Sequence, residues 1–165
     1  MTFTIVRDTR ELDWPDHPWL PFIPEDWRVS SATLSTGDFA LEGAEDSAVV
    51  ERKAVADLLA CIGSGRERFE RELQRGRYCG RFIVVVEGSY EDLLGAARGL
   101  HVNAIIGSLA AWQRRYCPFF FAGNVETAVA FALRFLSQPY SESLDTVRRI
   151  QRVNRNAEKQ QAVAV

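Results

Sequence analysis

The stretch V-V-E-R-K-A-V-A-D-L-L at Val49–Leu59 decides the fold. Its opening valines are apolar and β-branched, which predicts a strand over Val49–Lys53. Consecutive side chains of a strand point to opposite faces of the sheet. We therefore expect Glu51 and Lys53 on one face of this strand and Arg52 on the other.

The stretch S-T-G-D-F-A-L at Ser35–Leu41 precedes this strand and contains a Gly-Asp pair. A short acidic connection, Glu42–Ser47, joins the two stretches, so we expect a second strand here that pairs with the first. This pairing brings Asp38 next to Glu51 and Lys53. The three side chains are expected to meet at one place on a rigid sheet.

Two carboxylates and an ammonium group at one place suit phosphodiester chemistry. The carboxylates can hold Mg²⁺, which polarises a phosphoryl oxygen and lowers the pKa of a bound water. Lys53 can orient or help deprotonate that water and balance charge on the phosphate. The alternative is an ordinary surface salt bridge, which is worth little. Lys53 and Lys159 are the only lysines of the chain, which favours a specific need for a compact ammonium group at position 53.

These motifs resemble a known family. G-D followed by E-R-K-x-x-x-D is the signature of the XPF-type structure-specific endonucleases, a branch of the PD-(D/E)xK nuclease superfamily. The family also begins with a strand that ends in D-x-R-E, and the same motif follows Phe3–Val6 here. The resemblance covers the first two-thirds of the chain. The matching residues are Asp8, Arg10, Glu11, Gly37, Asp38, Glu51, Arg52, Lys53 and Asp57.

The resemblance implies a DNA endonuclease that depends on Mg²⁺ or Mn²⁺. It implies that Asp38 and Glu51 bind the metal ion, with help from Asp8 and from the main-chain carbonyl of Arg52. The residues alone leave a second reading of Asp8 open, as a helix N-cap or turn residue. The resemblance also implies branched, flap or junction DNA as the substrate, in repair or recombination, and a homodimer.

Three further positions of the motifs receive secondary roles. Arg10 and Glu11 are expected to orient the metal ligands and the phosphate. Asp57 is expected to have a supporting role, and its carboxylate suits the N-terminal end of a helix in any case.

Arginines recur along the next helix, predicted over Arg66–Tyr78. Arg68, Arg71 and Arg75 share one face, and Phe69 and Leu73 form the buried stripe. A solvated helix face is the alternative to a phosphate-binding face. Because this helix directly follows the E-R-K strand and its helix, we predict that the three arginines bind DNA phosphates.

Length and composition limit the possible domain organisation and binding modes. The 165 residues suit one domain, and the net charge of −2 means that DNA affinity must come from local patches. Three widely spaced cysteines predict free thiols in a reducing cytoplasm. We expect no signal peptide and no membrane span.

Strands alternate with helices through short connections, which predicts a three-layer α/β domain. The resemblance implies the restriction-endonuclease-like form, α/β/α with a central mixed sheet. Arg28–Leu34 and Asp38–Leu41 are expected to form a meander that leads into Val49–Lys53. The remaining expected strands are Phe3–Arg7, Arg81–Glu87 and Cys117–Ala122, and the remaining helices are Ala54–Ile62, Tyr90–Ala97, Val102–Tyr116 and Val125–Leu136.

Two titratable residues outside the motifs bear on the site. His17 lies in the proline-rich loop Leu12–Trp27 and is predicted to lie at the surface, because no partner motif surrounds it. Glu87 ends the strand Arg81–Glu87, and the sequence leaves open whether it faces the site or caps the next turn.

Residues 1–140 are predicted to form the nuclease domain and residues 141–165 a basic helix and tail with Arg148, Arg149, Arg152 and Arg155. The tandem helix-hairpin-helix region that often follows in this family is not recognised. The rival function is a non-catalytic DNA-binding or partner subunit. A nuclease acting on RNA or on unbranched ends is a further alternative.

Overall fold

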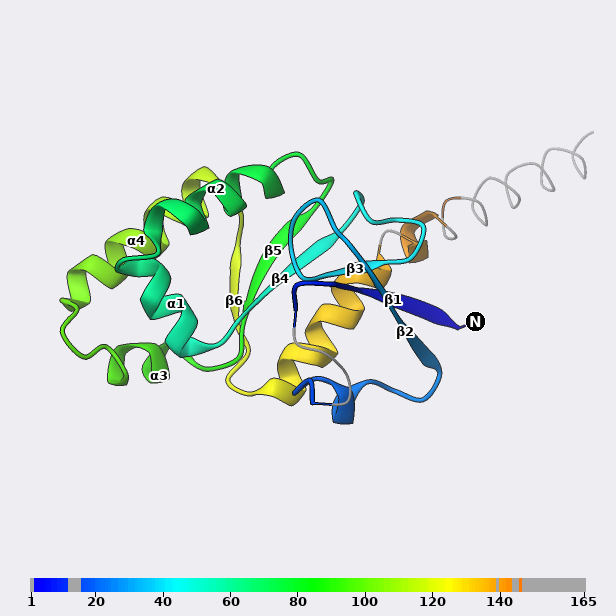
Figure 1. Ribbon diagram of the computed structural model, residues 1–165, viewed down its shortest axis with the longest axis horizontal. Helices are drawn as coiled ribbons and strands as arrows, with labels where there is room; N and C mark the ends of the chain where they lie inside the picture. Colours follow the sequence, from blue (N-terminus) through cyan, green and yellow to red (C-terminus); the bar gives the residue numbers. More distant parts are fainter. Residues whose placement is uncertain (1, 12–15, 139, 144–145, 147–165) are drawn as a thin grey trace, which may run out of the picture.

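The computed structural model describes residues 2–11, 16–138, 140–143 and 146. It contains a six-stranded sheet with helices on both faces (Figure 1). The strands are β1 (Phe3–Asp8), β2 (Trp27–Ala32), β3 (Phe39–Leu41), β4 (Val49–Lys53), β5 (Phe82–Val86) and β6 (Phe119–Phe121). The helices are α1 (Val55–Ile62), α2 (Arg66–Gly76), α3 (Tyr90–Gly95), α4 (Val102–Arg115) and the 3-10 helix η1 (Leu20–Phe22), and residues 125–138 and 140–143 are also helical.

The sheet is mixed, with the strand order β2-β1-β3-β4-β5-β6. β3 runs antiparallel to both of its neighbours, β1 and β4. β4, β5 and β6 run parallel to one another, and β2 runs parallel to β1. This confirms the predicted α/β class with a central mixed sheet.

The expected meander is wrong at β2. This strand pairs with β1 and forms one edge of the sheet, while β1 occupies the place beside β3. The two strands differ in burial, because four of the six β1 residues are buried and none of the β2 residues is. The more buried strand takes the inner position, and the more exposed strand forms the edge.

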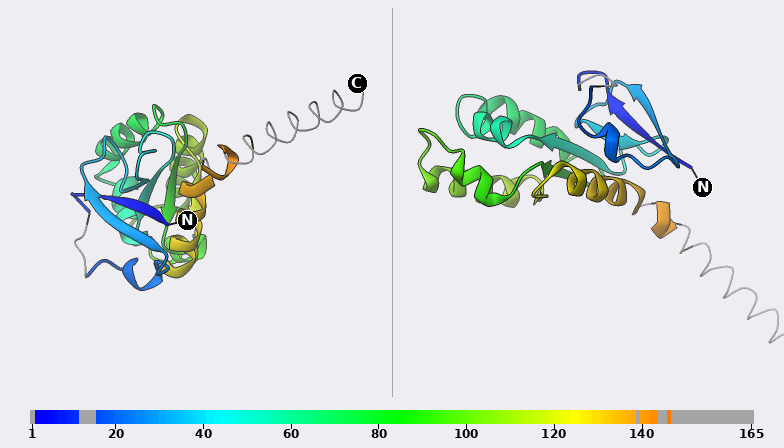
Figure 2. Two further views of the ribbon diagram at one scale, coloured as in Figure 1. Left: turned by 90° about the vertical axis from the view of Figure 1, so that its right-hand side faces the viewer. Right: turned by 90° about the horizontal axis from the view of Figure 1, so that it is seen from below.

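Each face of the sheet has its own core. α1, α2 and α4 pack on one face, against Val49, Val84 and Val86. The 125–138 helix and Trp19 pack on the other, against Val50 and other strand residues. Figures 1 and 2 show the β1–β2 pair at the opposite end of the molecule from α1 to α4.

Local signals set several helix ends. The Asn124 side chain accepts a hydrogen bond from the Thr127 N–H at 2.8 Å and caps the 125–138 helix, as expected. Residues 63–65 separate α1 from α2.

No helix in the described part of the chain is long and apolar enough to cross a membrane. The basic segment expected around residues 148–155 lies outside the described residues, so the division at residue 140 stays a prediction.

Candidate active site

The candidate site lies where β4 ends and β3 begins. Asp38 comes just before β3, and its N–H donates to the carbonyl oxygen of Val50 at 2.9 Å. Gly37 lets the two strands meet here. Its φ is +73°, and a Cβ at this position would lie 2.3 Å from Cγ1 of Val49. The Gly-Asp pair therefore has a structural cause, because only glycine permits this close approach.

Asp38 opens into a cavity of about 550 Å³ between the end of β4 and the α1–α2 turn. Six of the nine motif residues line this cavity, and Glu51 and Asp8 are bonded to lining residues. The lining residues are Arg10, Glu11, Asp38, Arg52, Lys53, Asp57, Ala60, Cys61, Ser64, Gly65 and Arg68.

Glu51 and Lys53 share a face of β4, as the alternation predicted. Lys53 Nζ donates to Glu51 Oε1 at 2.5 Å, and it lies 5.0 Å from the centroid of the Phe69 ring. Glu51 is only 1% exposed, and its Oε2 atom is buried without a hydrogen-bond partner among the described residues. A buried carboxylate oxygen without a donor is costly unless another group, such as a cation, binds it.

Burial and mutual repulsion change the acidity of the site. Burial raises the pKa of Asp38 to about 7, and the Glu11 carboxylate adds to the rise. Burial and the Asp38 charge raise the pKa of Glu51 well above its usual value. Burial alone would lower the pKa of Lys53, but the Glu51 and Asp38 carboxylates outweigh it and raise that pKa. Lys53 is thus held as an ammonium ion, which favours orienting the water over deprotonating it.

Asp8 lies at the end of β1, away from the cavity lining. Its two oxygens accept hydrogen bonds from the main chain and side chain of Arg10 and from the N–H of Leu34, at 2.6–2.9 Å. These bonds lower the pKa of Asp8 despite its burial. This geometry favours the turn-residue alternative over the metal ligand that the resemblance implied.

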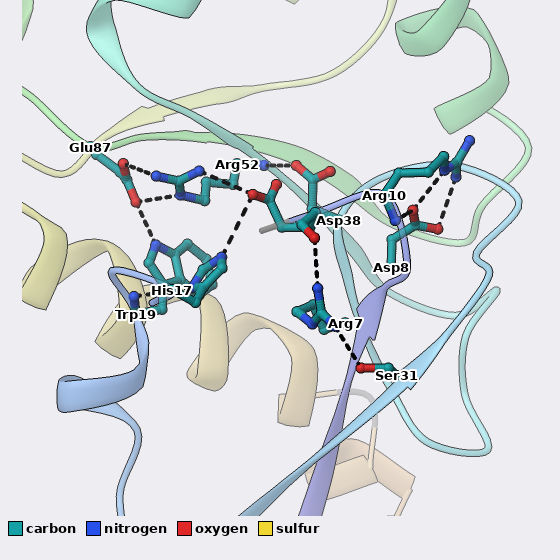
Figure 3. A network of polar contacts seen from close by, with 10 residues as sticks. Arg7, Asp8, Arg10, His17, Trp19, Ser31, Asp38, Arg52 and Glu87 are labelled. Atoms are coloured by element: carbon teal, nitrogen blue, oxygen red, sulfur yellow. Dashed lines mark hydrogen bonds and ion pairs between the residues drawn. The ribbon is translucent and has the colours of Figure 1, made fainter. Parts of the chain in front are cut away.

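A polar network that the sequence did not predict joins Arg52 of the cavity lining to Glu87 and Trp19 (Figure 3). Glu87 accepts from Arg52 Nε at 2.6 Å, from Arg52 Nη2 at 2.8 Å and from Trp19 Nε1 at 2.5 Å. Arg52 Nη1 also lies 3.3 Å from Glu11 Oε1. Glu87 therefore faces the site through Arg52, which resolves the open question about its role.

His17 is not at the surface, so that prediction is wrong. It is 1% exposed, and its ring lies against Trp19 and Phe39. Its Nε2 atom is 3.7 Å from Glu11 Oε1. Phe39 belongs to β3, far along the chain from His17, so no local motif signalled the burial of His17.

Arg7 is a further residue that the sequence analysis missed. It is 4% exposed, and it donates to the main-chain oxygen of Glu11 at 2.6 Å and to Ser31 Oγ at 2.9 Å. The signal was a charged residue directly after the apolar Ile5 and Val6 of β1. Arg7 ties Glu11, which lines the cavity, to Ser31 of β2.

The predicted DNA-contacting arginines lie on α2. Phe69 and Leu73 are buried, as expected, while Arg68, Arg71 and Arg75 are exposed. Arg68 also lines the cavity. Arg71 lies 3.9 Å from Glu67, and both side chains are largely exposed, so the pair neutralises little of its charge.

Asp38 and Glu51 fit a divalent cation. The unpartnered Oε2 of Glu51 and the raised pKa values of both carboxyls show negative charge that a cation would neutralise. Within the described residues, no three Asp, Glu, His or Cys side chains converge as a complete metal site. Two carboxylates nevertheless suit Mg²⁺, which keeps several waters and takes oxygen ligands from phosphate.

The chain is similar to known proteins in both sequence and structure. The family model described as the ERCC4 domain matches residues 7–135. The structure of XPF from Aeropyrum pernix is similar with a TM-score of 0.65 and 20% identity, over 90% of this chain and 70% of that chain. XPF from Aeropyrum pernix in complex with DNA gives a TM-score of 0.63 and 19% identity, over 85% of this chain and 66% of that chain. At these identities the likeness shows the fold. No curated protein matches the sequence.

Proposed function

The chain belongs to the ERCC4 domain family and has an XPF-type nuclease domain, and from this premise we propose that it is a metal-dependent endonuclease that hydrolyses DNA phosphodiester bonds. One observation carries the proposal. Two carboxyls with raised pKa values, Asp38 and Glu51, lie beside a protonated lysine at a cavity that three arginines line.

Asp38 and Glu51 would hold Mg²⁺ or Mn²⁺, which when bound supplies Lewis-acid polarisation of the phosphoryl group and a water of lowered pKa. Lys53 orients the attacking water and stabilises charge that develops on the phosphate. Arg10 and Arg52 add positive charge along the cavity wall, while Glu11 and Asp57 have supporting roles. The metal role of Asp8 is the weakest part of the predicted set, because its oxygens already accept four hydrogen bonds.

DNA is the proposed substrate, in branched, flap or junction form and in repair or recombination. The solved structure of XPF from Aeropyrum pernix in complex with DNA supports DNA as the ligand class. Arg68 connects the cavity to Arg71 and Arg75 farther along α2, which gives a basic path for a phosphate backbone. Such contacts do not read base sequence, which suits recognition of DNA shape.

We also propose a homodimer in a reducing compartment such as the cytoplasm. The 125–138 helix buries one side on the sheet, so that side is already used. Its half-buried Phe131 and Phe135 form a stacked series with Phe120 of β6 and are the large apolar side chains that a second copy could cover. Three free cysteines suit a reducing compartment. Light scattering at micromolar concentration should give twice the monomer mass. A measured mass equal to that of the monomer, both with and without DNA, would reject the dimer.

The activity test uses purified protein, Mg²⁺ and labelled flap, fork, junction and linear DNAs. We expect cleavage near the branch of at least one branched DNA and none by Asp38→Asn. Cleavage of linear DNA or RNA alone would change the substrate class. DNA binding without cleavage by the wild type would favour the non-catalytic subunit instead.

A further inference from the structure

Glu87 stands outside the motifs and outside the cavity lining, yet it accepts three short hydrogen bonds. Two come from the Arg52 guanidinium and one from the Trp19 indole (Figure 3). Its side chain is only 7% exposed. We infer that Glu87 is a positioning residue, which holds Arg52 in its place at the cavity and is itself held by Trp19. The inference rests on the proposed nuclease function.

Arg52 connects this anchor to the candidate metal ligands. Its main-chain N–H donates to Asp38 Oδ2 at 2.7 Å, and its side chain reaches Glu87 and Glu11. A guanidinium has five N–H groups. Glu87 and Glu11 occupy three of them, which leaves two for a phosphate in the cavity that Arg52 lines. A bidentate pair fixes both the position and the plane of a guanidinium.

The charge of Glu87 has a second effect. Asp38 is an acidic neighbour of Arg52 and would compete for its side chain if Glu87 did not bind it. An Arg52 side chain that moved to the Asp38 carboxylate would neutralise the charge that a divalent cation needs. Loss of the Glu87 charge is therefore expected to weaken metal binding as well as phosphate orientation.

The same three residue types occur a second time in the chain, away from the carboxylates. Trp112 Nε1 donates to Glu70 Oε1 at 2.8 Å, and Arg66 Nε lies 3.4 Å from the same oxygen. Neither Glu70 nor Arg66 lines the cavity. Glu70→Gln is therefore a matched control for Glu87→Gln, since it removes the same charge from the same kind of cluster.

The test measures single-turnover cleavage, DNA affinity and Mn²⁺ affinity by calorimetry, with thermal melting to check the fold. We expect Glu87→Gln to cleave about 10- to 100-fold more slowly and to bind Mn²⁺ about tenfold more weakly, with DNA affinity within about threefold. Glu70→Gln should match the wild type in all three. Because Glu87 acts through Arg52, Arg52→Gln and the double variant should cleave at the same rate as each other.

Two results would overturn the inference: equal Mn²⁺ affinity and rate for Glu87→Gln and Glu70→Gln, or a double variant that combines both single losses. If Glu87→Gln does not fold, Trp19→Phe keeps the ring that stacks on Phe39 and removes the indole donor, and should give a smaller loss in the same direction. A wild type that cleaves no DNA would defeat the proposed function. The Mn²⁺ comparison would then decide the role of Glu87 alone.

Discussion

At the scale of single residues, Lys53 separates the two interpretations of the site. Its ammonium group lies between Glu51 and the Phe69 ring, where the larger planar guanidinium of arginine does not fit the same contacts. We expect Lys53→Arg to lower the single-turnover cleavage rate by about 10²–10⁴ and to leave DNA affinity nearly unchanged.

The comparison for this exchange is Arg114→Lys, which makes the reverse substitution at an exposed position of α4 and should cleave like the wild type. A Lys53→Arg variant that cleaves as fast as the wild type would reduce Lys53 to an ordinary salt-bridge residue.

Asp38 makes the stability of the metal-free protein depend on pH. Folding raises its pKa from 3.8 to about 7, so the folded state favours the protonated carboxyl. Protonated Asp38 therefore favours the folded state. This contribution to the free energy of unfolding is complete below pH 4 and is lost as the pH rises through 7. Asp38→Asn stays neutral, so with a chelator present it should melt roughly 2–6 °C above the wild type at pH 8, and the gap should narrow towards pH 4.

Asp57→Asn provides the control, because Asp57 is exposed in the same cavity. It should not become more stable than the wild type as the pH rises from 4 to 8, because it removes no buried charge. A constant gap between Asp38→Asn and the wild type from pH 4 to 8 would contradict the burial of this charge.

Sequence reasoning worked for site residues whose placement depends on local geometry. Strand alternation placed Glu51 and Lys53 on one face, and the short connection brought Asp38 beside them. Glu87 and Trp19 could not be paired in this way, because 68 residues separate them and neither stands in a motif. His17 was misplaced for the same reason, since its burial depends on Phe39 from another strand.

At the scale of elements, the entry into β3 depends on Gly37. Its positive φ and its contact with Val49 both oppose a side chain. Gly37→Ala should reduce the free energy of unfolding by about 2–4 kcal/mol, measured by urea denaturation. Gly43 has a similar φ of +77° but no atom within 4 Å of its virtual Cβ. Gly43→Ala should cost about 1 kcal/mol, and equal losses at the two positions would exclude the close approach as the cause.

The boundaries of β4 were predicted correctly, and those of the other strands and helices largely so, because hydrophobic runs and turn residues mark them. Which strands pair with each other was harder to predict. Arg28–Leu34 precedes β3 in the chain, which favoured a meander, but its exposed pattern suits an edge, and the parallel pairing with β1 is a long-range contact that composition does not encode.

At the scale of the whole molecule, DNA binding depends on where the charges lie and not on the net charge. The chain carries −2 overall, so any DNA affinity comes from local arginines. Arg71→Gln combined with Arg75→Gln should weaken DNA binding in the same way for every sequence. The slope of log affinity against log salt should become shallower by about 1 for each lost phosphate contact.

Arg134→Gln serves as the control for this pair, because Arg134 is exposed on the helix that packs on the opposite face of the sheet. Its salt dependence should equal that of the wild type. If Arg134→Gln and the α2 double variant changed the slope equally, α2 would not be a particular path for DNA.

The place of β5 between β4 and β6 also determines the order in which the site can assemble. Ribosomes release the chain from its N-terminus, so the D-x-R-E, G-D and E-R-K segments all emerge before β5. Until β5 pairs with β4, Glu87 is not in place and Arg52 lacks its anchor. Parallel pairing across an intervening pair of helices is also slow to form. A nascent chain thus carries every signature motif of the nuclease before it carries the assembled site.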